Sequence, residues 1–89
     1  MERIAEVTVP NKYGLHARPA AELVKLANRF RAEVWVGKDG LEVNAKSIMG
    51  VLMLAAECGS TVTLRASGDD ADDAIAALES LVANGFGES

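Results

Sequence analysis

The sequence predicts a two-layer α+β sandwich, in which three helices cover one face of a four-stranded antiparallel sheet. Four segments alternate polar and apolar residues, as strands do when one sheet face is buried and the other meets water, and this pattern is typical of antiparallel sheets. Three other segments show helical spacing, giving the order strand, helix, strand, strand, helix, strand, helix. The 89 residues are 49% apolar and 25% charged, so we expect one globular domain over residues 1–89.

The first strand is expected from about Ile4 to Val9, where apolar residues alternate with Glu6 and Thr8, and Pro10 ends it. The first helix is expected over 17–30, because its apolar residues recur at helical spacing and charged residues occupy the other side. These apolar positions are Ala20, Leu23, Val24, Ala27 and Phe30.

A hairpin follows, because Asp39-Gly40 suits the positive φ angles of a tight turn between the alternating runs 34–36 and 41–43. A second helix should begin after Ser47 and end near Gly59, since glycine readily adopts the left-handed conformation beyond a helix end. The apolar residues expected to face the core are Val51, Leu54, Ala55 and Cys58.

The fourth strand is expected at 61–67, where Val62, Leu64 and Ala66 alternate with polar residues. The last helix should begin after Gly68, because aspartates at 69–73 favour the positive end of a helix dipole. Its predicted core face is Ala74, Ile75, Leu78, Leu81 and Val82, and Trp35 is expected to cover one face of the sheet.

The charge distribution argues against nucleic acid as a partner, because the net charge is −4 and phosphate-backbone binding needs a dense basic surface. The charge is uneven: the balance is +3 over residues 1–38 and −7 over residues 39–89. A locally basic face could therefore meet an acidic partner or an anion. The sequence has one cysteine, no apolar run long enough to cross a bilayer and no signal-peptide pattern, so we expect a cytoplasmic protein without a membrane segment.

His16 is the candidate reactive residue. It stands in Gly14-Leu15-His16-Ala17-Arg18-Pro19-Ala20, directly before the first helix. Backbone N–H groups at a helix start have no partner inside the helix and bind anions, and the guanidinium of Arg18 suits phosphate oxygens. A lone histidine lacks the companions of a metal site or of a hydrolytic triad, so no metal or cofactor is expected. The arrangement favours transient acceptance of a phosphoryl group; the alternative is a loop histidine beside a solvated arginine.

Ser47 has two interpretations. It is a preferred residue for capping the second helix, and its hydroxyl could also be a phosphorylation site. The helix after it is apolar nearly all round, which leaves a stripe of Ile48, Met49, Leu52 and Met53 outside the core. Such a stripe marks a partner surface or packs under a loop. The aspartates at 69–73 do not fit a calcium loop, because Ala71 and Ala74 occupy positions where that pattern needs other residues.

These residues resemble the histidine-containing phosphocarrier protein family, HPr, of the bacterial phosphoenolpyruvate-dependent sugar phosphotransferase system. The segment 14–20 resembles the family's active-site segment, and Lys46-Ser47-Ile48-Met49-Gly50-Val51 resembles its regulatory segment. Their separation and the ending Gly85-Phe86-Gly87-Glu88 also fit, so the resemblance covers the whole chain.

The resemblance implies that His16 accepts a phosphoryl group on Nδ1 from phosphorylated Enzyme I and passes it to a histidine of a sugar-specific IIA component. Arg18 would steady the phosphate, and Asn11 or Lys12 would supply a loop contact near the site. Ser47 would be modified by an HPr kinase and the product read by a transcriptional regulator. The expected partner surface of this monomeric carrier is Ala17, Arg18, Ala21, Ile48, Met49 and Leu52.

Two other functions remain as alternatives. One is an HPr-like regulatory interaction module of a nitrogen or carbon control pathway, although His16 argues against a relative that lacks the histidine. The other is a small RNA-binding domain, which would need exposed sheet aromatics or a GxxG loop with basic flanks.

Overall fold

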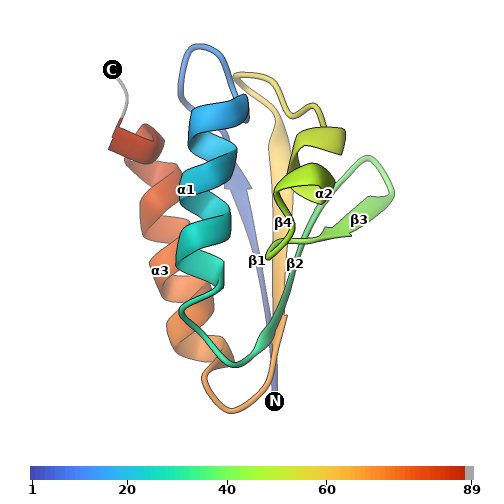
Figure 1. The fold of residues 1–89 in the computed structure, drawn as a ribbon, viewed down its shortest axis with the longest axis vertical. Coiled ribbons are helices and arrows are strands. Elements are labelled where there is room, and N and C mark those ends of the chain that lie inside the picture. The colour runs from blue at the N-terminus through green and yellow to red at the C-terminus, as the bar shows by residue number, and fades with distance from the viewer. Residues whose placement is uncertain (88–89) are drawn as a thin grey trace.

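The computed structural model describes residues 1–87. Figure 1 shows one sheet with its helices on the same side, and the two-layer α+β prediction is confirmed. The elements follow the order β1 (Glu2–Thr8), α1 (Ala17–Ala27), β2 (Glu33–Lys38), β3 (Leu41–Asn44), α2 (Ile48–Met53), β4 (Thr61–Ser67), α3 (Ala71–Ala83) and the short 3-10 helix η1 (Gly85–Gly87).

The sheet has the strand order β1-β4-β2-β3, and each neighbouring pair is antiparallel. β4 therefore lies between β1 and β2, and Ser67 is opposite both Glu2 and Glu33. The predicted hairpin is confirmed, because Asp39 and Gly40 both have positive φ angles, 51° and 85°. Both turn residues adopt the conformation that a two-residue hairpin of matching twist requires.

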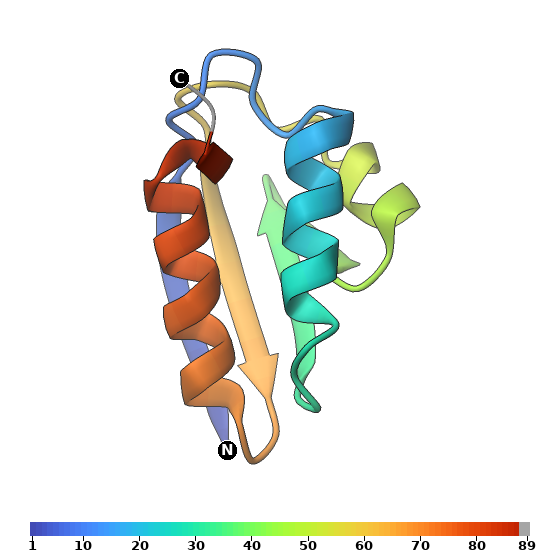
Figure 2. The ribbon, with the colours of Figure 1, turned by 60° about the vertical axis from the view of Figure 1, so that its left-hand side comes forward.

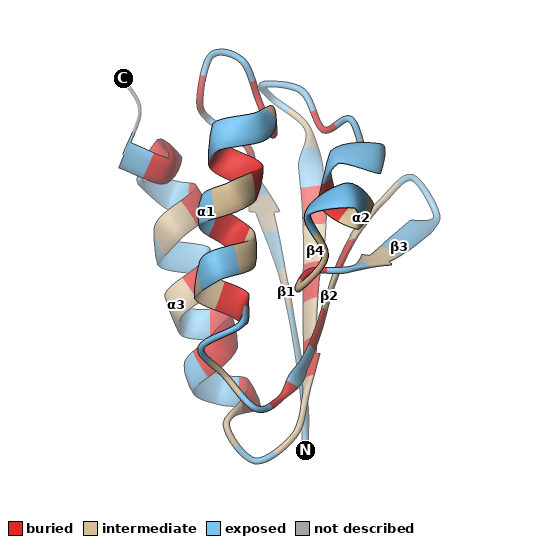
Figure 3. Cartoon of the chain, viewed as in Figure 1, coloured by how far each residue is buried: buried red, intermediate tan, exposed pale blue. Residues whose placement is uncertain are grey.

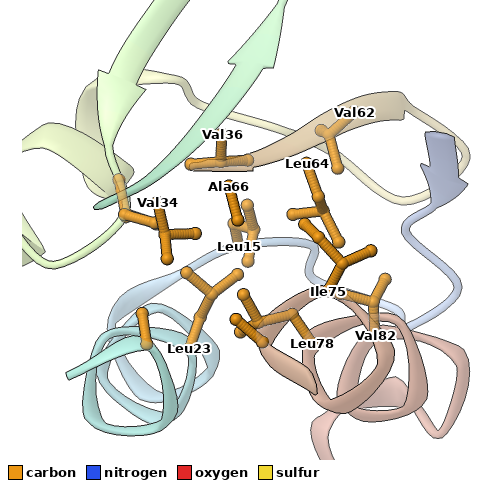
Figure 4. Close-up of a cluster of buried hydrophobic side chains, with 14 of the residues drawn as sticks. Leu15, Leu23, Val34, Val36, Val62, Leu64, Ala66, Ile75, Leu78 and Val82 are labelled. Atoms are coloured by element: carbon orange, nitrogen blue, oxygen red, sulfur yellow. The ribbon is translucent and has the colours of Figure 1, made fainter. Parts of the chain in front are cut away.

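The core fills the space between the sheet and the helices (Figure 4). Alternate residues of β2 and β4 point into it, as predicted from their period of two. The predicted core positions of α1 and α3 are buried or partly buried. The largest fully buried side chains include Leu23, Val34, Val36, Leu64, Ile75 and Leu78.

The predicted end of the second helix is wrong. α2 ends at Met53 rather than near Gly59, and Ala55 has a φ of 50°. An L-residue in this left-handed conformation cannot continue a right-handed helix. Ala55 and Cys58 are consequently exposed, not packed in the core as predicted. The first helix is also shorter than expected, because Asn28 caps it and Phe30 lies beyond its end.

The open face of the sheet carries Trp35, which is half-buried beneath Arg65. The guanidinium carbon lies 3.8 Å from the Trp35 ring centroid, and Arg65 also forms ion pairs with Glu2 and Glu42. Hydrogen bonding to Arg65 lowers the pKa of the Glu42 carboxyl. Trp35 thus covers a sheet face as predicted, and the guanidinium of Arg65 stacks on its ring.

Asp70 ties the start of α3 to the loop between α1 and β2. Its two carboxylate oxygens accept the backbone N–H groups of Arg31, at 2.9 Å, and Ala32, at 2.8 Å. These bonds favour the ionised carboxylate, so the N–H of Arg31 first, and then that of Ala32, lower the pKa of Asp70.

Replacing Asp70 should therefore remove a pH-dependent contribution to stability. Because the folded-state pKa is lowered, this contribution is present above the unfolded value of about 4 and is lost as pH falls through the lowered folded value. Asp70→Asn should reduce the melting temperature at pH 7, and its melting temperature should approach that of the unmodified protein as pH falls below the unfolded pKa. The neighbouring aspartate provides the control: Asp69→Asn should melt like the unmodified protein, and equal melting of both variants at pH 7 would contradict this role.

Candidate functional site

The candidate site lies at the end of the molecule where the β1–α1 loop meets the α2–β4 loop (Figure 2). Backbone hydrogen bonds join the two loops. Val9 donates to the carbonyl of Ser60 at 2.9 Å, and Gly59 donates to the carbonyl of Val9 at 2.8 Å. Leu15 donates to the carbonyl of Ala56 at 2.8 Å. The last of these bonds fixes the backbone one residue before His16.

Gly14 allows this docking. Its φ is 65°, and a Cβ atom built there would lie 2.3 Å from the Ala56 oxygen and 2.8 Å from Glu57 Cα. Only glycine combines the left-handed conformation with such a close backbone approach at low cost. Asn11 closes the loop from the other side, since its buried side chain donates from Nδ2 to the Gly14 carbonyl at 2.7 Å.

His16 is the N-cap residue of α1, as predicted. Its backbone is extended, with φ −77° and ψ −173°, and its carbonyl accepts the first helical hydrogen bond from Ala20 at 2.9 Å. Its ring makes no side-chain capping bond. Pro19 lies in the first helical turn, where its missing N–H removes no intrahelical bond.

The His16 side chain lines an open cleft of about 540 Å³ at the start of α1. Two basic side chains and one acidic side chain line the cleft together with His16, aromatic residues and a glycine near the C-terminus. Its lining consists of Lys12, Tyr13, His16, Arg18, Glu22, Phe86 and Gly87. Arg18 is exposed, so its guanidinium has room to reach an anion in this cleft.

The structure separates the roles of Asn11 and Lys12. Asn11 is buried and holds the loop through its bond to Gly14, whereas Lys12 lines the cleft. Tyr13 lies between Lys12 and His16. The Tyr13 and His16 ring centroids are 6.0 Å apart with an interplanar angle of 89°, and Lys12 Nζ lies 5.3 Å from the Tyr13 centroid.

Ser47 caps α2, as the first interpretation predicted. Its Oγ accepts the backbone N–H of Gly50 at 3.2 Å. The start of α2 lies beside the C-terminal end of α1, because Asn28 donates to the Lys46 carbonyl at 3.3 Å and Lys46 Nζ donates to the Phe30 carbonyl at 2.7 Å. The start of α2 therefore lies away from His16, which begins α1 at its opposite end.

The apolar stripe on α2 is exposed, and Figure 3 shows most of α2 as exposed ribbon. Met49 and Met53 are 68% and 70% exposed, and Ile48 and Leu52 are 37% and 36% exposed. The alternative that this stripe packs under a loop is thereby excluded. Of the other predicted surface residues, Ala17 is exposed and Ala21 is half-buried; the docking role of this surface stays a prediction.

Sequence reasoning did not assign Tyr13, Glu22 or Phe86 to the site. Glu22 follows Arg18 by four residues, so the helical period alone could have placed them together. Tyr13 and Phe86 belong to irregular segments, and Phe86 itself has a φ of 59°. No periodic pattern reports where such residues lie.

Other site classes find no support in residues 1–87. No three His, Cys, Asp or Glu side chains in this range gather as metal ligands. No helix in the same range is long and apolar enough to span a bilayer.

Comparisons with known proteins agree in one family. The family described as "PTS HPr component phosphorylation site" matches residues 4–84. The chain is 53% identical over 83 residues to the phosphocarrier protein HPr of Cupriavidus necator, covering 93% of each chain. It is also 51% identical over 77 residues to the HPr-like protein Crh of Halalkalibacterium halodurans, covering 86% of this chain and 92% of that one. The crystal structure of HPr-C-His from Thermoanaerobacter tengcongensis superposes with a TM-score of 0.95 at 47% identity, covering 98% of both chains.

The docking of the two loops predicts a specific sensitivity at Gly14. Gly14→Ala should destabilise the protein by about 2–4 kcal/mol, because left-handed strain adds to a clash with backbone that cannot move aside. Gly59 offers the matched control, since its φ is 89° but nothing lies within 4 Å of the position that a Cβ atom would take there. Gly59→Ala should cost only the conformational strain, about 1–2 kcal/mol. Urea denaturation measures both, and equal losses would show that close approach at Gly14 is unimportant.

Proposed function

We propose that the chain, which belongs to the HPr family of the phosphotransferase system, is a phosphocarrier of that system and that His16 is the residue that carries the phosphoryl group. The observation that supports this most directly is the position of His16. Its ring lines an open cleft with Arg18 at the start of α1. The first-turn N–H groups of Ala17 and Arg18 have no partner inside the helix and can bind phosphoryl oxygens.

The proposed step is a phosphoryl transfer between two imidazole rings. The Nδ1 lone pair of His16 attacks phosphorus, a new N–P bond forms, and the N–P bond to the donor histidine breaks with its electron pair returning to the donor ring. The His16 ring loses one proton and the donor ring gains one, so charge balances. The protein mainly positions the group and stabilises its charge: Arg18 pairs with the oxygens, and the start of α1 adds backbone donors.

The proposed donor is phosphorylated Enzyme I, and the proposed acceptor is a histidine of a sugar-specific IIA component. Docking would use Ala17, Arg18 and Ala21 of α1 together with Ile48, Met49 and Leu52 of α2. The two helices pack against each other, so these residues can form one surface. A carrier that must leave each partner quickly suits a small, transient interface, and the basic residues beside the cleft suit acidic partners. We propose that it acts as a cytoplasmic monomer.

Ser47 is the proposed regulatory site, modified by an HPr kinase and then read by a transcriptional regulator. Phosphorylation would add about −1.5 to −2 charges at the start of α2, where the helix dipole tolerates negative charge. Because Ser47 lies at the far end of α1 from His16, the added charge would act on the apolar docking stripe instead of on the phosphoryl group. It would oppose the desolvation of Ile48 and Met49 and repel an acidic partner.

An HPr-like regulatory module of nitrogen or carbon control is the second candidate, and the similarity to Crh supports it. In that case Ser47 and the apolar stripe would serve the function without transfer at His16. Acceptance of a phosphoryl group by His16 distinguishes the two candidates.

His16→Ala should abolish acceptance of acid-labile phosphate from phosphoenolpyruvate and Enzyme I. The fold should survive, with a melting temperature within about 4 °C of the unmodified protein, because His16 lies outside the hydrophobic core. Acid-labile phosphate retained by the variant would refute the assignment.

Arg18→Ala should slow transfer from Enzyme I by roughly 10- to 100-fold through loss of a charge that pairs with the transferring group. Stability should change little, because Arg18 is exposed. Arg29→Ala, which removes an exposed arginine beyond the end of the same helix, serves as the control and should transfer normally. Matching kinetics in both variants would identify Arg18 as a solvated charge.

Ser47→Asp should weaken docking to Enzyme I, seen as a raised KM, while the maximal rate of transfer changes less. Ser47→Ala should keep the unmodified KM and lose about 1 kcal/mol of stability through the missing cap. Steady-state kinetics and thermal melts separate the two effects. A KM that is the same in Asp, Ala and unmodified protein would leave Ser47 as a helix cap only.

A further inference from the structure

Two side chains beside His16, Lys12 and Tyr13, have no part in the transfer step described above. Both line the cleft. The Tyr13 ring meets the His16 ring edge-on, at 6.0 Å and 89°, and Lys12 Nζ lies 5.3 Å from the centre of the Tyr13 ring. An ammonium, a phenol and an imidazole therefore follow one another along the cleft.

The backbone around these two residues is held on both sides. Asn11 bonds to Gly14 through its side chain, Gly14 N–H donates to the Asn11 carbonyl at 3.1 Å, and Leu15 is bonded to Ala56. Tyr13 nevertheless stays 69% exposed, so its ring adds little to the core. The loop thus presents Lys12 and Tyr13 toward the cleft from a fixed backbone.

The charges in the cleft create a need for a second cation. A phosphoryl group on His16 would bring negative charge into a cleft that already contains the Glu22 carboxylate, and Arg18 is the cation on the α1 side. Lys12 is the cation on the loop side. Its flexible stem carries three rotatable donors, and an exposed ammonium on an aromatic face is held only weakly. The Lys12 ammonium can therefore rotate toward phosphoryl oxygens at little cost while the apolar stem of Lys12 stays beside the Tyr13 ring.

We infer that Lys12 is a second phosphoryl-binding cation, and that Tyr13 is a positioning residue that holds the Lys12 ammonium and the His16 ring in place for it. This inference rests on the proposed transfer at His16. Arg18 and Lys12 would then contact the phosphoryl oxygens from opposite sides of the cleft, and together they would offset Glu22.

The experiment compares Lys12→Met and Lys12→Arg with the unmodified protein. Lys25→Met is the matched control, because it removes an exposed lysine from the last turn of α1 and changes the net charge equally. Two quantities are measured: the rate of transfer from Enzyme I, and the pH titration of the phosphoryl group by ³¹P NMR on the isolated phosphorylated protein. Because the NMR titration is made without a partner protein, it reports only on the surroundings of the phosphoryl group.

Lys12→Met should slow transfer by roughly tenfold, less than the hundredfold or more typical of a buried donor, and Lys12→Arg should restore most of the rate. The phosphoryl group should titrate at higher pH in Lys12→Met than in the unmodified protein, because a nearby cation favours the more highly charged form. Lys25→Met should match the unmodified protein in both measurements.

An unchanged ³¹P titration in Lys12→Met would overturn the inference, whether or not transfer slows. A slower rate with an unchanged titration would mean that Lys12 contacts the partner protein and not the phosphoryl group. If the unmodified protein takes no phosphate on His16, the proposed function itself fails, which is a distinct result.

Tyr13 is tested by Tyr13→Phe and Tyr13→Leu. Phenylalanine keeps the ring and should behave like the unmodified protein, whereas leucine should move the ³¹P titration toward that of Lys12→Met. Identical titrations in the leucine, phenylalanine and unmodified proteins would refute the positioning role of Tyr13.

Discussion

The position of His16 depends on one backbone hydrogen bond, from the Leu15 N–H to the Ala56 carbonyl. This bond docks the loop after β1 onto the loop before β4, and α1 begins directly after it. It requires Gly14, since any Cβ at that position would meet the Ala56 oxygen. His16 is therefore placed by a residue far along the chain. Burial of Ala20, Leu23 and Ala27 in the core then anchors α1, whose first-turn N–H groups lie at the same end of the helix as His16.

The cleft and the start of α2 lie at opposite ends of α1. Its N-terminal end forms the cleft with His16 and Arg18, and its C-terminal end is joined to the start of α2 by Asn28 and Lys46. An 11-residue helix rises by about 16 Å, so a charge on Ser47 is well outside the cleft. The exposed stripe of α2 lies between the two ends. Any influence of Ser47 on transfer is best explained through the surface that a partner covers.

Much of the fold could be predicted from the sequence, because the period of two in the strands and the period of 3.6 in α1 and α3 reflect burial directly. The end of α2 could not be predicted in this way. Residues 48–56 are apolar except for Gly50, and such a run does not show where its helix stops. The helix stops because Ala55 turns left-handed and Ala56 is needed to bond Leu15. The core position predicted for Cys58 depends on the longer helix, and Cys58 is therefore exposed.

The candidate site was predictable in part. His16 as a helix cap followed from a local pattern, and Ser47 as a cap followed from its residue type before an apolar run. Tyr13, Glu22 and Phe86 come together with His16 only in the folded chain. The choice between Asn11 and Lys12 likewise needed the structure, because adjacent loop residues can point inward or outward without any sequence signal.

Whether His16 carries the phosphoryl group can be measured on the unmodified protein. It would be incubated with phosphoenolpyruvate and Enzyme I, and its intact mass and its ³¹P and ¹⁵N NMR spectra would be recorded before and after acid treatment. We expect a single phosphoryl group on Nδ1 of His16, lost in acid, with shifts of the Ala17 and Arg18 amides. No adduct, an acid-stable adduct, or a phosphoryl group on any other residue would contradict it.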